Sequence, residues 1–553
     1  MPNPREPGGG GLVAVLGVFG GQRGLSPCSA HPIVRGMATS GRFVPSAWLI
    51  AALTLASRLL GLVRESIFSY YFSTSELLSA FRIAFQAPNL ARRLFGEGAL
   101  SSAMIPVLTE SIQQRGEEES RRFVGTILTL LATVLGLAVI GIEIIIAVWR
   151  TVHDDLALRL TAVMMPYMAL ICTAAVASGV LNVRQHFAVP AAAPTILNVV
   201  MIVALVGGSL LGGLTQASLM YLVCGGVLLA GVIQVGITGV ALRRASFFPT
   251  FGGAWRDPQL RRVFALMAPM ALGLSAVQIN TLMDSVIAYL FIREGGERVG
   301  PAVLGYAQFL YQLPLGVFGI SLATAIFPVL SSKAAEGDRV GMADVFERGI
   351  RMSLFIALPS SIGLIFVAHP LVATLYQRGE FDASDTQRVA STLVYYSLGL
   401  AAYFAQHIVI RTFYALQESR TPARVAVYMV ALNLAMNLSL VFVMEERGLA
   451  LSTSVSATVQ VIWLLVRLRR VLPEIGWVRL GLGLSRTVLA TAVMAGVLCI
   501  LTATGLSIHR LVGRSAFELA ILVGVGLAVY YLAARVLKIE ELATALQYTG
   551  DGG

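Results

Sequence analysis

The stretch SAWLIAALTLASRLLGLVRESIFSYYFSTSELLSAFRIAFQAPNLARRLFGEGALSSAMIPVLTE, residues 46–110, decides the fold of this chain. It holds two apolar segments joined by a short polar link at residues 73–76. Each is long enough to cross a bilayer, which takes about 20 apolar residues. Both nevertheless carry charges, namely Arg58, Arg64, Glu65, Arg82, Arg92, Arg93 and Glu97. A charge at mid-bilayer costs roughly 2.5–3.5 kcal/mol on the insertion scale, so these side chains are expected to face water, a partner charge or a ligand.

Helical spacing gathers these polar residues onto one face of each segment. At about 100° per residue, the first helix places Ser57, Arg58, Gly61, Arg64 and Glu65 within an arc of about 120°. The second places Arg82, Gln86, Asn89, Arg93 and Glu97 within about 80°, with Arg92 further round. Two such faces predict a cationic cavity wall whose ligand is an anion. The alternative is that some arginines, Arg82 above all, extend to the lipid headgroups.

The composition is that of an integral membrane protein. Of the 553 residues, 56% are hydrophobic and 13% are charged, and the mean hydropathy is +0.77. Soluble domains carry about 25% charged residues, so the chain is predicted to be an all-α polytopic membrane protein. The four cysteines, Cys28, Cys172, Cys224 and Cys499, are scattered and form neither a disulfide framework nor a metal-binding spacing.

Fourteen membrane spans are predicted along the chain. They cover about 46–72, 76–110, 123–149, 156–181, 190–213, 217–242, 263–292, 300–331, 350–376, 388–416, 422–444, 448–467, 484–505 and 515–536. With the amino terminus inside, inner loops hold almost three times as many Lys and Arg residues as outer loops, which places both termini in the cytoplasm. This asymmetry explains the net charge of +11, so nucleic acid is not an expected partner.

A faint internal repeat suggests how the spans are grouped. The second span contains Gln86-Ala87-Pro88 and the eighth contains Gln312-Leu313-Pro314, each followed by Phe-Gly and then Pro-Val-Leu. The repeat predicts two six-helix bundles, spans 1–6 at residues 45–243 and spans 7–12 at 258–471. Residues 480–540 then hold two extra C-terminal helices, and 541–553 form a cytoplasmic tail. Residues 1–44 are expected to be a disordered extension; a signal peptide, or a start at Met37, is the alternative.

The remaining polar residues offer ion ligation and no enzyme chemistry. No zinc-protease, phosphate-loop or serine-hydrolase motif is present in the sequence. Asp284 lies in the seventh span, Asn433 and Asn437 lie one turn apart in the eleventh, and Ser452-Thr453-Ser454 begin the twelfth. A carboxylate with amide and hydroxyl oxygens suits a hard cation. Equally, these groups could hydrogen-bond neighbouring helices.

Several motifs resemble a known transporter family. They are SRLLGLVRE at 57–65, PNLARRLFGEGALSSAMIPVL at 88–108, FAVPAAAPTILN at 187–198, LYQRGEF at 375–381 and ALQESRTPARVAV at 415–427. Together they resemble the MurJ (MviN) family of lipid II flippases, in the multidrug/oligosaccharidyl-lipid/polysaccharide exporter superfamily, over residues 45–540. The resemblance implies a V-shaped, two-lobed body with a cationic cavity in the inner membrane. It also implies export of undecaprenyl-diphosphate-linked disaccharide-pentapeptide, lipid II, to the outer face.

The resemblance assigns roles to particular residues. It implies that Ser57, Arg58, Arg64 and Arg92 bind substrate, with Asn89 and Arg93 in the same motif, and that Glu65 and Glu97 gate the cavity. It also implies a sodium site at Asp284, Asn433, Asn437 and Thr453 with the Leu449 carbonyl. Asn437 stands where an aspartate can occur in the family, which lowers the charge of that site.

The chain departs from the family pattern at three charged positions. Phe309 replaces a cavity arginine, Gln308 replaces its acidic neighbour, and Ser79 replaces an aspartate. Arg82, in contrast, stands where the family is usually apolar. Our hypothesis is that Arg82 restores the lost cation from the facing lobe and joins the substrate-binding residues.

These observations predict a non-enzymatic lipid II flippase that works by alternating access, reset by membrane potential or by Na⁺ and without another cofactor. Its expected partners are lipid II, membrane lipids and proteins of cell-wall synthesis or division. Two alternatives remain open. One is a flippase for another polyprenyl-linked oligosaccharide, and the other is a non-transporting scaffold of cell-wall synthesis.

Overall fold

The computed structural model describes residues 43–96, 99–153, 155–250, 257–503 and 515–544. The N-terminal helices are α3 (Phe43–Phe72), α4 (Glu76–Ala91), η1 (Arg92–Gly96), α5 (Ala99–Arg115), α6 (Glu117–Arg150), α7 (Leu156–Met164), α8 (Pro166–Val183), α9 (Ala188–Leu210) and α10 (Gln216–Arg244). A long helix, α11 (Pro258–Phe291), and a hairpin of β1 (Arg293–Glu294) and β2 (Glu297–Arg298) follow.

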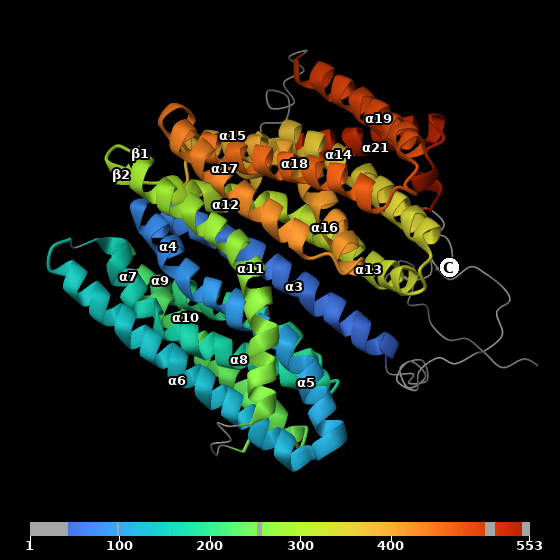
Figure 1. Cartoon of the computed structure of the whole chain (residues 1–553). Coiled ribbons are helices and arrows are strands. Elements are labelled where there is room, and N and C mark those ends of the chain that lie inside the picture. Colours follow the sequence, from blue (N-terminus) through green and yellow to red (C-terminus); the bar gives the residue numbers. More distant parts are fainter. Residues whose placement is uncertain (1–42, 97–98, 154, 251–256, 504–514, 545–553) are drawn as a thin grey trace, which may run out of the picture.

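The C-terminal helices complete the body. They are α12 (Gly300–Pro314), η2 (Leu315–Gly319), α13 (Ile320–Ala335), α14 (Arg339–Tyr376), α15 (Ala383–Leu398), α16 (Leu400–Ala415), α17 (Arg420–Met444), α18 (Glu446–Val471), α19 (Trp477–Ala503) and α21 (Ser515–Val536). Figure 1 shows the N-terminal helices on one side and α12–α21 on the other, with α3, α4 and α11 at the boundary. The predicted N-terminal extension lies outside the described residues up to residue 42, and α3 already begins at Phe43.

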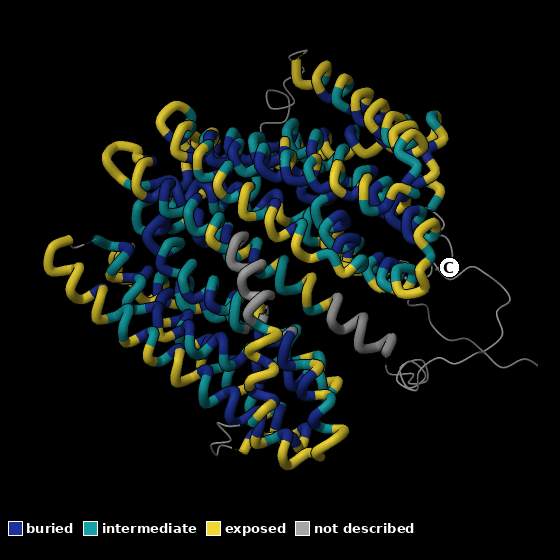
Figure 2. Tube along the Cα trace, viewed as in Figure 1, coloured by how far each residue is buried: buried dark blue, intermediate teal, exposed yellow. Residues whose placement is uncertain are grey.

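Most of these helices are suited to lipid. Ten described helices are long and apolar enough to cross a membrane, or eleven when the bent pair α15 and α16 counts as one span. Their outward faces expose large apolar side chains, among them Ile144 and Ile145 on α6 and Leu527 on α21 (Figure 2). The chain is therefore a helical, multi-pass membrane protein, as its composition predicted. The predicted spans at α3, α4–α5 and α11 are not among the ten or eleven, and they carry Arg58, Arg64, Glu65, Arg82 and Asp284.

The repeated Gln-x-Pro sequences mark two breaks in the helices. Pro88 lies in α4 one turn before the π-helix η1, and Pro314 ends α12 directly before the π-helix η2. Proline removes one backbone donor, and π-helical turns occur mostly as single insertions near functional sites. Both breaks lie along the boundary between the N-terminal and C-terminal helices, where the cavity forms.

Candidate functional site

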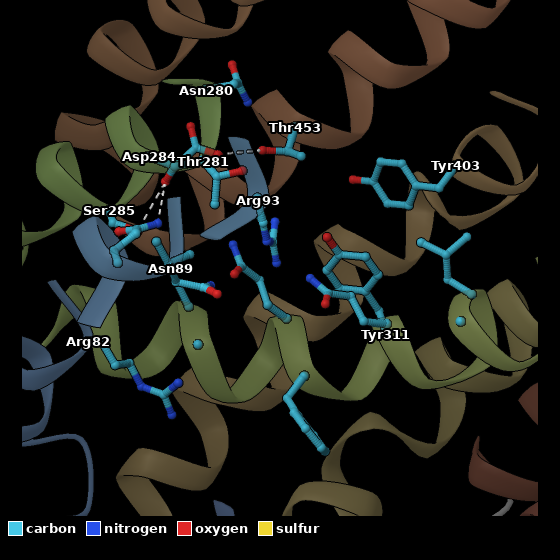
Figure 3. Close-up of a pocket in the computed structure, with 18 of the residues that line it drawn as sticks. Arg82, Asn89, Arg93, Asn280, Thr281, Asp284, Ser285, Tyr311, Tyr403 and Thr453 are labelled. Atoms are coloured by element: carbon cyan, nitrogen blue, oxygen red, sulfur yellow. Dashed lines mark hydrogen bonds between the residues drawn. The ribbon is translucent and has the colours of Figure 1, made fainter. Parts of the chain in front are cut away.

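A cavity of about 680 Å³ lies between the N-terminal and C-terminal helices. Its walls come from α3, α4 and η1 on one side, and from α11, α12, η2, α16, α17 and α18 on the other (Figure 3). Six of the residues singled out for substrate binding or gating lie in its wall: Arg58, Arg64, Glu65, Arg82, Asn89 and Arg93. Ser57 and Arg92 are not among its lining residues, and Glu97 lies outside the described residues.

Glu65 is the centre of a buried ionic cluster in the N-terminal wall. The residue is 3% exposed, and its carboxylate accepts hydrogen bonds from Arg64 at 2.6 Å and from Arg82 at 2.7 Å. Arg64 also donates to the Asn198 side chain at 2.9 Å, which attaches α3 to α9. One carboxylate between two guanidinium groups leaves a net positive charge, and the Nε atoms of both arginines are buried without a partner among the described residues. The cluster can therefore still donate to an anion.

Two arginines of the N-terminal wall rest on glycines of the opposite wall. The guanidinium of Arg82 occupies the space that a Cβ on Gly305 would fill, and it stacks over the Tyr306 ring with its Cζ atom 4.8 Å from the ring centroid. The guanidinium of Arg58 lies in the same way against Gly316 of η2. Arg58 forms no hydrogen bond with another described residue. Only glycine allows this close approach, so α12 and η2 are shaped to receive the two cations.

The other predicted arginines are held by amide side chains. Arg92 donates to the Asn89 side chain through Nε and Nη2, at 3.1 and 2.8 Å, one helical turn away. Arg93 donates to Gln278 of α11 at 3.1 Å. Ser57 contributes its backbone carbonyl, which accepts from Asn198 at 3.1 Å. Arg93 and Asn89 thus belong to the cavity wall, whereas Arg92 orients Asn89.

The residues proposed for sodium meet at the junction of α11, α17 and α18. Asn437 donates to Asp284 at 2.6 Å and to Asn433 at 2.7 Å, and Thr453 donates to Asp284 at 3.3 Å and to the Leu449 carbonyl at 3.1 Å. Asp284, Asn433 and Asn437 are at most 3% exposed. The Asn437 side-chain oxygen is buried with no partner among the described residues. Figure 3 shows Asp284 and Thr453 facing one another at the cavity edge.

The three departures from the family pattern have structural consequences. Ser79 accepts a hydrogen bond from the Ala302 backbone at 3.2 Å, which joins α4 to α12, and Gln308 donates to the Tyr396 hydroxyl at 3.0 Å. Phe309 approaches Gly61 of α3, where an added Cβ would lie 3.4 Å from its ring. These positions therefore carry neutral contacts here. The guanidinium of Arg82 on α4 packs against Gly305 and Tyr306 of α12, the helix that carries Phe309.

A second set of polar contacts closes one end of the cavity. Ser73 and Thr74, in the link between α3 and α4, both donate to Asp385 of α15. Asp155, before α7, accepts from Arg298 in the β hairpin and from the Tyr289 hydroxyl at 2.5 Å. Burial would raise the pKa of Asp155, but these hydrogen bonds outweigh it and hold its pKa below the ordinary range. The N-terminal and C-terminal helices are thus fastened together at the hairpin end.

The periodicity of the sequence did not reveal several of these residues. Asn198, Gln278, Gly305, Tyr306 and Gly316 each contact a predicted arginine from a distant helix. Asn198 does lie at the end of the motif 187–198, but its partner could not be read from that motif.

Comparisons with known proteins identify the family. The model of the family described as "Lipid II flippase MurJ" matches residues 68–512. A probable lipid II flippase MurJ of Rhizobium tropici is 31% identical over 88% of this chain and 93% of its own length. Lipid II flippase MurJ of Burkholderia cenocepacia is 32% identical over 81% of this chain and 88% of its own.

Solved structures agree in fold. The structure titled "Lipid II flippase MurJ, inward closed conformation" has a TM-score of 0.72 at 23% identity, covering 88% of this chain and 98% of that one. An inward-facing multidrug resistance MATE transporter of the MOP superfamily has a TM-score of 0.59 at 16% identity, covering 76% and 98%. The family is one of transporters, so the prediction that the chain is not an enzyme is confirmed. The chain belongs to the lipid II flippase MurJ family.

Proposed function

We propose that this chain carries lipid II, a polyprenyl-diphosphate-linked disaccharide-pentapeptide, from the inner to the outer face of the cytoplasmic membrane. The single observation that supports this most strongly is the net positive cluster of Arg64, Glu65 and Arg82 in the cavity wall, beside Arg58, which has no hydrogen-bond partner among the described residues. Guanidinium groups bind phosphate oxygens bidentately, so a diphosphate is the anion that such a wall fits best. The polyprenyl tail would remain in the bilayer beside the cavity.

In the transport cycle the cavity would open alternately to the inner and to the outer face of the membrane. In this structure the hairpin end is fastened by Asp155, Arg298, Asp385 and their partners. Binding of a diphosphate to Arg64 and Arg82 would compete with Glu65 for the same donors. The freed carboxylate would then raise the free energy of the closed state with substrate bound, because an unpaired buried charge is costly. This competition links substrate binding to a change in the contact between the walls.

The finer topology is part of the same proposal. We infer fourteen spans, with α3, α4–α5 and α11 added to the eleven apolar ones, in two six-helix lobes plus α19 and α21. The Pro-linked π-helices η1 and η2 support this division, since they occur in corresponding spans. The distribution of basic residues favours cytoplasmic termini, which places the hairpin end outside. Contacts with proteins of cell-wall synthesis or division stay a prediction.

We further propose that Na⁺ binds at Asp284, Asn433, Asn437, Thr453 and the Leu449 carbonyl. The fit is supported by the available ligand atoms, which are carboxylate, amide, hydroxyl and carbonyl oxygens, and by the burial of Asp284, Asn433 and Asn437. Hard cations are bound by such oxygens. A bound Na⁺ would supply a positive charge beside the one carboxylate of this cluster. Asp284, Asn437 and Thr453 would then hold α11, α17 and α18 together.

Rescue of flippase-depleted cells tests the proposed function. Cells that lose their own lipid II flippase would express the intact chain, Arg58→Ala or Arg64→Ala at matched membrane levels, and lipid II on the outer face would be measured. We expect rescue by the intact chain alone. Arg122→Ala is the control, because Arg122 is an exposed arginine paired with Glu118 far from the cavity wall. Failure of the intact chain would favour another lipid-linked glycan or a scaffold.

A further inference from the structure

The cavity wall opposite the arginines has a different chemistry. On α12, α16 and α18 it presents uncharged polar and aromatic side chains, namely Gln312, Gln406, His407, Ser456, Gln460 and the Tyr311–Tyr403 pair. Figure 3 shows Tyr311 and Tyr403 on one side of the cavity and Arg82 on the other. Among the described lining residues only Glu65 and Asp284 are acidic. This wall therefore offers hydrogen bonds without a fixed charge.

The amide and hydroxyl groups of this wall are not fully used within the protein. Gln406 donates to the Gln460 side-chain oxygen at 3.1 Å, and no other hydrogen bond of these two amides occurs among the described residues. The Gln406 oxygen and the Gln460 nitrogen therefore remain available. Ser456 lies one turn before Gln460 on α18, is 6% exposed, and its hydroxyl is buried without a partner in the described structure. Buried polar groups are rarely left unpaired, so the set calls for a ligand or water.

The tyrosines give this wall flat apolar surfaces beside the amides. The rings of Tyr311 and Tyr403 are stacked with centroids 5.3 Å apart, and each residue is 8% exposed. Stacked, mostly buried rings present a rigid face. Alternating amides, hydroxyls and ring faces match a group that carries many hydroxyls and amides but no charge. An N-acetylated sugar has this character, whereas a peptide stem with free carboxylates would need cations that this wall lacks.

We propose that Gln406, Gln460 and Ser456, beside Tyr311 and Tyr403, form a second subsite that binds the uncharged saccharide of a lipid-linked diphosphate. The inference rests on the proposed function, since it assumes that the arginines of the opposite wall hold the diphosphate. The two walls then divide recognition: charge selects the diphosphate, and the neutral wall selects the attached glycan. The saccharide would thus span the cavity between the N-terminal and C-terminal helices.

Two purified lipids separate the roles of the walls. The probes are undecaprenyl diphosphate and the same lipid bearing the N-acetylated disaccharide, and binding to the full chain in nanodiscs is measured. We expect the double variant Gln406→Met, Gln460→Met to weaken binding of the disaccharide lipid about tenfold, since each lost neutral hydrogen bond accounts for a factor of roughly 2 to 13. Binding of the bare diphosphate lipid should be unchanged. Gln113→Met, at an exposed site near the end of α5, is the matched control.

A single substitution provides a second test in case the double variant does not fold. Ser456→Ala removes a hydroxyl that has no protein partner, so it should keep the thermal stability of the chain while lowering affinity for the disaccharide lipid severalfold. Equal weakening for both lipids, or unchanged binding of the disaccharide lipid in both variants, would overturn the subsite. If the intact chain binds neither lipid, the proposed function itself fails and the subsite fails with it. Arg64→Ala should weaken both lipids together.

Discussion

Arg82 on α4 and Gly305 on α12 share one space: the guanidinium of the first fills the position where a Cβ of the second would be. The same guanidinium pairs with Glu65 on α3 and stacks on Tyr306. A cation of the N-terminal helices is therefore seated in a notch of the C-terminal helices. Gly305 lies one turn before Phe309 on α12. Phe309 stands at the position where the family pattern has an arginine, which would have come from the C-terminal helices.

Arg82→Ala should abolish lipid II export while leaving the protein in the membrane. The reason is that this change removes a cavity cation and leaves Glu65 with Arg64 alone, which cancels the net charge of the cluster. Export is measured as lipid II on the outer face of flippase-depleted cells, with Arg122→Ala as the surface control. Normal export by Arg82→Ala would refute the hypothesis that Arg82 replaces the missing arginine.

Gly305→Ala tests the same contact from the facing helix. The added methyl group would displace the Arg82 guanidinium from Tyr306, and we expect export to fall about three- to tenfold, as the loss of a partly desolvated cation–π contact implies. Gly363→Ala on α14 is the matched control, because a Cβ there meets no atom within 4 Å. Equal export by the two glycine variants would show that the notch has no role.

Glu65→Gln should destabilise the empty protein in a way that an anion reverses. Removing the carboxylate leaves Arg64 and Arg82 close together without their partner, and breaking such a buried pair costs on the order of 3 kcal/mol. The thermal denaturation midpoint should fall, and inorganic pyrophosphate should restore more of it in Glu65→Gln than in the intact chain. Glu118→Gln, at an exposed site, should change neither value. A pyrophosphate effect that is the same in all three proteins would argue against an anion site at this cluster.

Sodium should stabilise the chain through Asp284. A ligand that binds only the folded state raises the denaturation midpoint as its concentration rises. We therefore expect NaCl to raise the midpoint more than KCl at equal ionic strength, and Asp284→Asn to remove the difference. Asp344→Asn, at a half-exposed position on α14, controls for a general effect of charge. A sodium-specific shift that persists in Asp284→Asn would place the ion elsewhere.

The hairpin end should open when Asp155 is neutralised. Asp155→Asn removes the ion pair to Arg298, so the distance distribution between spin labels at Thr151→Cys and Glu297→Cys should broaden. Because the pKa of Asp155 is lowered in the folded state, its contribution to stability is full above the ordinary carboxyl pKa of about 3.9 and is lost as the pH falls through the lowered value. The distribution of the unmutated, doubly labelled chain should hence stay narrow at pH 5. Broadening at pH 5 would contradict this account of the Asp155 contact.

The sequence predicted the residues of the charged cavity wall better than their contacts with distant helices. Helical periodicity placed Arg64, Glu65 and Arg82 on inward faces, and each lies in the cavity wall, because the side-chain direction along one helix follows from its spacing. Arg92, which the same spacing places further round, lies outside the lining of the cavity and donates to Asn89. Partners from distant helices, such as Asn198 and Gly305, depend on helix packing that no local pattern encodes. The ligands proposed for sodium came from family resemblance, and spacing alone could not distinguish them from ordinary interhelical hydrogen bonds.

Reconstitution of the purified chain in proteoliposomes tests the central claim most directly. Labelled lipid II would be placed in the inner leaflet, and its arrival at the outer leaflet would be followed with the intact chain and with Arg64→Ala, at equal protein content. The account predicts rapid translocation by the intact chain, and translocation by Arg64→Ala no faster than in protein-free vesicles. Equal translocation by the two proteins would contradict the arginine wall, and no translocation by the intact chain under sodium gradients or membrane potentials of either sign would contradict the flippase itself.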